Sequence, residues 1–167
     1  MQPGVVIVAI GNRSRGDDAL GPLLLERLAS WLGAAGQAGG FELIEDYQLQ
    51  IEHALDLQGK RLALFIDAGR GTGAPLEFYP VAPARIAAVR STHALPPQGV
   101  LEVYRQFAQA EPPPAFVLCV RGERFELGEG LSASAQANLE SAWPRLLRLC
   151  QEAEATQWQA LAHAGTD

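Results

Sequence analysis

Three unbroken apolar runs constrain the fold of this chain more than any other feature. They lie at residues 5–10, 62–66 and 115–120. A strand that is apolar at every position has both faces buried, as happens when helices cover both sides of a parallel sheet. At 167 residues and 48% hydrophobic, the chain is large enough for one such core. We therefore predict a single domain over residues 1–167.

Segments with helical spacing alternate with these runs. Helices are predicted at 20–31, 51–57, 100–108 and 134–150, and further strands at 41–44 and, as an edge or antiparallel strand, at 76–81. Pro144 should kink or divide the last helix, and the tail 151–167 is expected to continue as helix and to fray. The alternation of strands and helices predicts a three-layer α/β domain.

Charge and composition exclude several classes of protein. The net charge of −6, with Lys60 as the only lysine, argues against binding to nucleic-acid phosphates. No stretch reaches the roughly 18 apolar residues of a membrane helix, and the N-terminus lacks the pattern of a secretory signal. Cys119 and Cys150 lie in apolar surroundings without metal-binding spacing. We expect a cytoplasmic protein that contacts neither membrane nor nucleic acid.

Acidic residues follow two of the predicted strands where ligands bind in such folds. Asp18 comes shortly after the first strand and Asp67 directly after the strand at 62–66, and His93 lies in a later loop. The carboxyl ends of parallel strands share one edge of a sheet, so these side chains could converge there. Two carboxylates and an imidazole suit a divalent ion such as zinc or nickel.

Each of these residues also has an ordinary structural explanation. Asp17 and Asp18 could cap the following helix, and we assign the capping or loop-bonding role to Asp17. Asp67 could pair with Arg70, and His93 could be a surface histidine. His53 is a competing ligand, whereas His163 should be solvated. Arg13 and Arg15 could neutralise the aspartates or hold a carboxylate of a substrate.

Two other kinds of site are weaker interpretations. The glycines at 11 and 16 have the spacing of a phosphate loop, but Asp17 and Asp18 stand where such a loop has Lys and Ser or Thr. Ser91-Thr92-His93 contains a possible nucleophile and base, but adjacent residues rarely form a catalytic hydrogen bond. Neither cysteine has a histidine or a basic residue beside it, which disfavours a cysteine nucleophile.

Several motifs resemble those of the hydrogenase maturation endopeptidases. The first is the strand 5–10 with Gly11-Asn12, followed after three residues by Gly16-Asp17-Asp18-Ala19-Leu20-Gly21. The others, in the same order as in that family, are Phe65-Ile66-Asp67-Ala68, Ser91-Thr92-His93 and the segment 125–132. The resemblance covers most of residues 4–150. It implies an α/β fold: a three-layer αβα sandwich of the phosphorylase/hydrolase-like type, whose twisted, mostly parallel sheet has about five strands with helices on both faces.

The resemblance implies an activity, a partner and a site. Members of that family remove a C-terminal extension from the large subunit of a nickel-iron hydrogenase after nickel insertion. Their nickel-contacting residues match Asp18, Asp67 and His93. The implied enzyme is a monomeric endopeptidase, either aspartic-type or metal-assisted. Its nickel arrives with the substrate precursor, and it uses no organic cofactor.

The chain departs from the family pattern at two places. Asp18 stands where relatives often have the longer Glu, so the ion would lie closer to the loop. Residues 45–57 replace a glycine-rich Asp-Gly-Gly-Thr stretch, and this variant resembles the subgroup that serves soluble, NAD-linked hydrogenases. The alternative function is a non-catalytic nickel-sensing chaperone that binds the same precursor.

Overall fold

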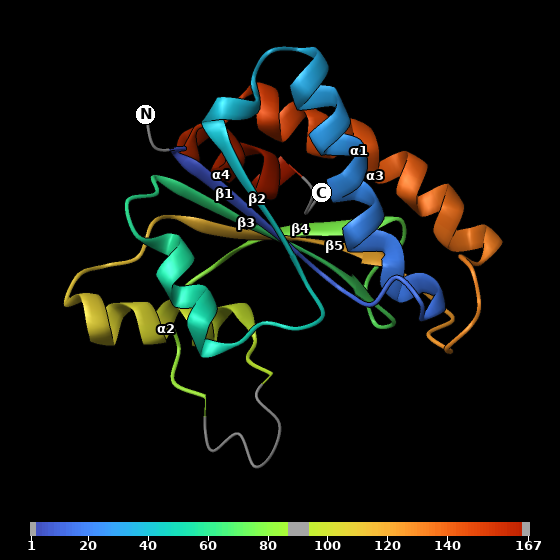
Figure 1. The fold of residues 1–167 in the computed structure, drawn as a ribbon, viewed down its shortest axis with the longest axis horizontal. Helices are drawn as coiled ribbons and strands as arrows, with labels where there is room; N and C mark the ends of the chain where they lie inside the picture. The colour runs from blue at the N-terminus through green and yellow to red at the C-terminus, as the bar shows by residue number, and fades with distance from the viewer. Residues whose placement is uncertain (1–2, 87–93, 165–167) are drawn as a thin grey trace.

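Five strands form one sheet in the order β2-β1-β3-β5-β4 (Figure 1). The computed structural model describes residues 3–86 and 94–164. The strands are β1 (Val5–Ile10), β2 (Phe41–Asp46), β3 (Leu62–Gly69), β4 (Leu76–Val81) and β5 (Ala115–Arg121). β2, β1, β3 and β5 are parallel, and β4 pairs antiparallel with β5 at the edge. The predicted, mostly parallel sheet with an antiparallel edge strand is confirmed.

Helices cover both faces of the sheet. The helices on one face are α1 (Leu20–Ala34), α3 (Ala133–Gln151) and α4 (Ala155–Ala164), and those on the other are α2 (Pro97–Ala108) and the 3-10 helix η3 (Ile51–Leu57). Side chains of β1 point alternately to the two faces of the sheet. Ile7 belongs to the hydrophobic core beneath α1, α3 and α4, and Val6 and Val8 belong to the core beneath α2 and η3. This burial on both sides explains the unbroken apolar run and confirms the three-layer αβα prediction.

The segment after α3 differs from the sequence prediction. The expectation of a frayed tail over 151–167 is wrong for its described part, because α4 packs into the core. Trp158 is fully buried, its ring lies 5.4 Å from that of Phe116, and its indole N–H donates to the carbonyl oxygen of Leu149 at 2.9 Å. The apolar pattern of α4 is short, with Trp158, Leu161 and Ala162 buried, so helical periodicity alone gives a weak signal.

Helix α3 runs unbroken through Pro144, so the predicted division of this helix is wrong. Proline removes one backbone hydrogen bond from a helix. Here the buried side chains of Ala142 and Leu146 on either side anchor the helix to the core, which compensates for the missing bond.

The central strands bring two loops together at one end of the sheet. β1 and β3 are neighbours, and their register runs from Val5 opposite Leu62 to Ala9 opposite Ile66. The chain leaves the sheet after Ile10, whereas β3 continues beyond Ile66 to Gly69 as a partner of β5, so Asp67 lies within the strand and not directly after it as predicted. No helix in residues 3–86 and 94–164 is long and apolar enough to cross a membrane.

Candidate functional site

A tight loop places Asp18 at the carboxyl end of β1. The 3-10 helix η1 (Gly16–Ala19) follows this loop and carries Asp18 back over the strand. Gly11 has φ +151°, and a Cβ at this position would lie only 1.9 Å from the backbone oxygen of Asp18. The backbone N–H of Asn12 donates to Oδ2 of Asp18 at 2.8 Å. The half-buried carboxylate is thus held by its own loop.

Asp67 lies near the end of β3, and its ionisation is perturbed. Burial raises the pKa of Asp67 to about 6; the hydrogen bond from the Ala68 N–H opposes this shift, and the negative charge of Asp18 adds to it. The Ala68 N–H lies 2.8 Å from Oδ1. The charge of Asp18 thus acts on Asp67 from the neighbouring strand end, and a proton or a cation near the two carboxylates would relieve this repulsion.

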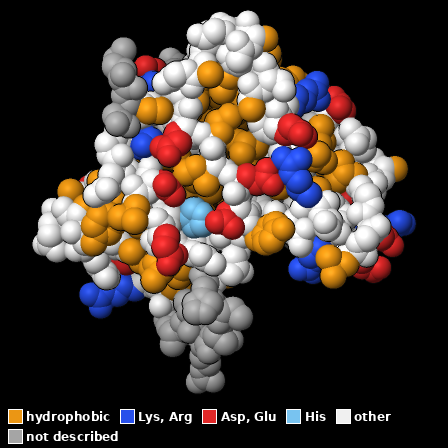
Figure 2. Space-filling model, viewed as in Figure 1, with side chains coloured by type: hydrophobic (Ala, Val, Ile, Leu, Met, Phe, Trp, Pro, Cys, Tyr) orange, Lys and Arg blue, Asp and Glu red, His pale blue; other side chains and the backbone are white. Residues whose placement is uncertain are grey.

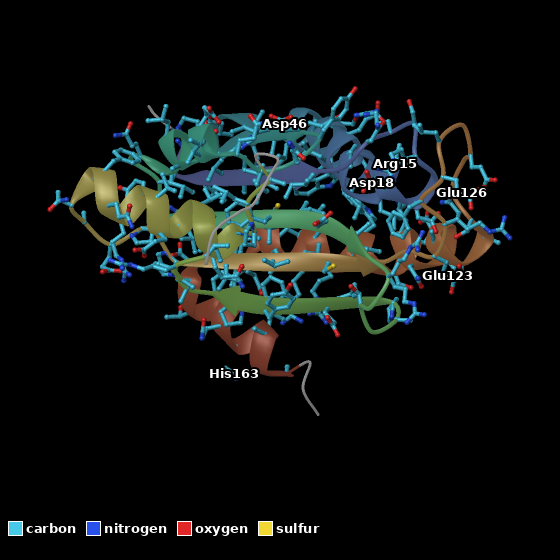
Figure 3. The ribbon with its side chains drawn as sticks, turned by 90° about the horizontal axis from the view of Figure 1, so that it is seen from below. Arg15, Asp18, Asp46, Glu123, Glu126 and His163 are labelled. Carbon is cyan, nitrogen blue, oxygen red and sulfur yellow. The ribbon has the colours of Figure 1, made fainter. Side chains whose placement is uncertain are left out.

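The Asp18 carboxylate opens into a cleft of about 450 Å³. The cleft is lined by Arg15, Asp18, Ala68, Arg70 and Phe125. Its walls come from the loop after β1, the end of β3 and the loop 122–132. Figure 3 shows Arg15 and Asp18 together at this end of the molecule, with Glu123 and Glu126 of the loop 122–132 beyond them.

Asp17 has a structural role that is distinct from that of Asp18. It is fully buried, and its carboxylate accepts hydrogen bonds from the backbone N–H groups of Glu123, Arg124 and Ser132 and from the Ser132 hydroxyl, at 2.7–3.0 Å. Burial raises the pKa of Asp17, but these hydrogen bonds outweigh it and the net pKa is lowered. The predicted loop-bonding role is confirmed. The capping role is wrong, because the N-cap of α1 is Ala19.

His93, the third predicted site residue, lies outside the described residues, as do Ser91 and Thr92. Within the described ranges, no three His, Cys, Asp or Glu side chains come together as a metal site. The pair of Asp18 and Asp67 is therefore the part of the predicted site that the structure brings together.

The other two histidines lie elsewhere. His53 is buried; its Nδ1 accepts from the Gln50 N–H at 2.9 Å, and its Nε2 lies 3.3 Å from Oδ2 of Asp46. Both ring nitrogens are thus engaged in fixing the start of η3. Figure 2 shows acidic side chains gathered at the centre of the face around β2 and η3. His163 is exposed on α4, far from Asp18 (Figure 3).

The basic residues near the aspartates divide between two roles. Arg13 forms a bidentate pair with Glu45, at 2.9 and 2.7 Å, and a second ion pair with Glu26, so it does not neutralise Asp18. Arg15 lines the cleft. No ion pair joins Arg70 to Asp67 among the residues described, so the predicted alternative for Asp67 is not what the structure shows.

The phosphate-loop interpretation finds no support in the loop geometry. Five backbone N–H groups of the loop donate to acceptors within the protein, those of Gly11, Asn12, Ser14, Arg15 and Gly16. A phosphate loop needs such groups free to bind the anion. The loop instead serves to position the carboxylates.

Sequence reasoning missed two cleft residues. Arg70 was considered only as a partner of Asp67, and Phe125 only as part of a resembling segment. The signal for Arg70 is its place directly after the Asp67 strand end. Phe125 is brought to the cleft by the bonds between Asp17 and the loop 122–132, a contact between distant segments that periodicity cannot reveal.

Comparison with known proteins finds similar folds. No protein-family model and no curated protein matches the chain. The hydrogenase maturation protease HycI from Thermococcus kodakarensis KOD1 is 23% identical, with a TM-score of 0.64 over 88% of this chain and 92% of that chain. The hydrogenase-maturating endopeptidase HybD from E. coli is 20% identical, with a TM-score of 0.65 over 92% of this chain and 94% of that one. The shared property at these identities is the fold.

Proposed function

We propose that this protein, which has the fold of the hydrogenase maturation proteases, is an endopeptidase that trims the C-terminal extension of a nickel-iron hydrogenase large-subunit precursor after nickel insertion. The observation that carries the proposal is the electrostatic interaction of Asp18, which lines the cleft, with Asp67 on the neighbouring strand, in a chain whose fold matches those proteases over about nine-tenths of its length. The motifs around both aspartates resemble those of the same family.

The two carboxylates suit a cation that arrives with the substrate. Burial and the negative charge of Asp18 make the charge of Asp67 costly, and a divalent ion would relieve that cost. In the proposal Asp18, Asp67 and His93 contact the nickel of the precursor, so that the enzyme recognises only matured substrate. Nickel would then serve as a mark on the substrate rather than as a resident cofactor.

Two routes to hydrolysis fit these residues. The Lewis-acidic ion would polarise the scissile carbonyl or lower the pKa of a bound water. Alternatively, an aspartate would accept the proton of the attacking water as a general base, which Asp67 is suited to do because its pKa lies near neutrality. In both routes water is the nucleophile, and the products are a new C-terminal carboxylate and a free peptide.

A cysteine nucleophile does not fit. Cys119 lies opposite Asp67 in the register of β3 and β5, with its sulfur 3.0 Å from Oγ1 of Thr72. Burial raises the pKa of the Cys119 thiol, the Thr72 hydrogen bond opposes this, and the charges of Asp67 and Glu77 add to it. An acidic neighbourhood of this kind disfavours the thiolate.

The experiment compares nickel-loaded with nickel-free precursor. Because residues 45–57 resemble the subgroup that serves soluble, NAD-linked hydrogenases, the large subunit of such a hydrogenase is the first substrate to test. Each form is incubated with the protein, which we expect to act as a cytoplasmic monomer, and the intact mass of the large subunit is measured. The loaded form should lose its extension and the nickel-free form should keep it.

Binding without cleavage would favour the alternative function. If the protein binds the loaded precursor but the mass stays unchanged, the endopeptidase proposal is wrong and a nickel-sensing chaperone is the better description.

A further inference from the structure

Two arginines contact the same residue, Phe125, at the cleft. Arg15 comes from the loop after β1, Arg70 follows the end of β3, and Phe125 belongs to the loop 122–132. The Nε of Arg15 donates to the backbone oxygen of Phe125 at 3.2 Å. The guanidinium carbon of Arg70 lies 5.0 Å from the centre of the Phe125 ring. Phe125 thus holds both guanidinium groups at the same cleft.

These contacts position the arginines without neutralising them. No carboxylate within residues 3–86 and 94–164 forms an ion pair with Arg15 or Arg70, even though Asp18 lines the same cleft. Six other basic side chains are paired with glutamates, whereas Arg85, Arg121, Arg124 and Arg145 have no ion pair within the described residues but lie outside the cleft lining; the paired ones are Arg13, Arg27, Lys60, Arg61, Arg105 and Arg148. The terminal nitrogens of Arg15 and the guanidinium edges of Arg70 remain available to a ligand.

We propose that Arg15 and Arg70 form a clamp that binds a carboxylate of the substrate segment entering the cleft. A guanidinium presents parallel N–H donors that match the two oxygens of a carboxylate. The cleft volume of about 450 Å³ lies in the range of sites that bind small ligands or short peptide segments. This inference rests on the proposed function, because it assumes that a peptide occupies the cleft.

The charges of the cleft explain why such a clamp is needed. A carboxylate that enters the cleft is repelled by Asp18, and Arg15 and Arg70, which line the same cleft, offset that repulsion. The carboxylate has two possible sources: an acidic side chain near the scissile bond, or the new C-terminus that hydrolysis creates. The first source would affect substrate binding, and the second would affect product release.

A binding experiment tests the clamp without relying on cleavage. The Nε–H signals of the ¹⁵N-labelled full-length protein are followed by NMR, with Arg15→Lys and Arg70→Lys identifying the two signals. The probes are acetyl-Gly-Gly as the free acid, acetyl-Gly-Gly amide and acetyl-Gly-Asp-Gly amide. A probe with a carboxylate should shift both signals and the neutral amide should shift neither. Equal shifts with all three probes, or none with any, would overturn the clamp.

The relative strength of the two carboxylate probes identifies the source. Tighter binding of the free acid assigns the clamp to the new C-terminus, and tighter binding of the aspartyl peptide assigns it to an acidic side chain.

A cleavage experiment then tests the clamp in the reaction. Arg15→Gln and Arg70→Gln should each weaken precursor binding or product inhibition about tenfold, with a smaller effect on kcat, since each removes one charged hydrogen-bonding group. Arg145→Gln, which changes an arginine on α3 outside the cleft, is the matched control. If the wild type cleaves and the double glutamine variant behaves identically, the clamp is wrong. If the wild type cleaves nothing, the proposed function fails, while the NMR result still decides the clamp.

Discussion

Replacing Asp17 with asparagine should destabilise the fold far more than the same change at Asp18. Oδ2 of Asp17 accepts from the N–H groups of Glu123 and Arg124 and from the Ser132 hydroxyl, and Oδ1 accepts from the Ser132 N–H. Asparagine supplies one acceptor oxygen, so its NH₂ group must face at least one of these buried N–H donors. An unsatisfied buried donor costs about 1–3 kcal/mol, and each remaining bond weakens when its acceptor loses charge. The sum is about 4 kcal/mol.

The assay is urea denaturation of the wild type, Asp17→Asn and Asp18→Asn at pH 7. For a chain of this size, about 4 kcal/mol corresponds to a Tm lowered by about 10 °C. Asp18 accepts one backbone N–H, from Asn12, which an asparagine oxygen can also accept. Asp18→Asn should therefore change the free energy of unfolding by less than about 1 kcal/mol.

The pH dependence provides a second check. Because the folded-state pKa of Asp17 is lowered, its stabilisation is present above the unfolded value of about 3.9 and is lost as the pH falls through the folded pKa. The difference between the wild type and Asp17→Asn should thus shrink in strong acid. Equal stability of Asp17→Asn and the wild type at pH 7 would refute the role assigned to this carboxylate.

Three further changes give measurable outcomes. Trp158→Ala should lower the free energy of unfolding by about 3–5 kcal/mol in urea melts, because it removes a fully buried ring from the core. If the tail were frayed, the substitution would leave the free energy of unfolding unchanged. Because the folded pKa of Asp67 is raised to about 6, the contribution of Asp67 to wild-type stability should fall as the pH rises from 4 to 7. Asp67→Asn should lack this loss and gain about 1–2 kcal/mol at pH 7, allowing for solvent screening. Cys119→Ser should retain the wild-type cleavage rate in the mass assay, and loss of activity there would contradict water as the nucleophile.

The apolar runs made much of the sheet predictable. Residues buried on both faces leave a continuous signal, as at Val5–Ile10, and this signal survives without knowledge of the tertiary structure. The position of Asp18 and Asp67 at adjacent strand ends followed from the rule that parallel strands share a carboxyl edge. These features depend on local sequence and on topology alone.

Contacts between distant segments were beyond prediction. Asp17 looked like a helix cap because its bonding partners, more than a hundred residues away, are invisible to local patterns. The burial of Trp158 likewise depends on Phe116 and Phe78 in the sheet. The same limit applies to Phe125, whose place at the cleft follows from the loop that Asp17 holds.

Asp18 and Asp67 are proposed to act together on nickel-loaded precursor, and mass measurement of the cleaved large subunit tests this. The intact mass of the large subunit is followed with the wild type, Asp18→Asn, Asp67→Asn and His93→Ala. Glu126→Gln, an exposed acid in the neighbouring loop, is the matched control. The account predicts loss of the extension with the wild type and Glu126→Gln, and an unchanged mass with the other three folded variants. Full cleavage by Asp18→Asn or Asp67→Asn would contradict it.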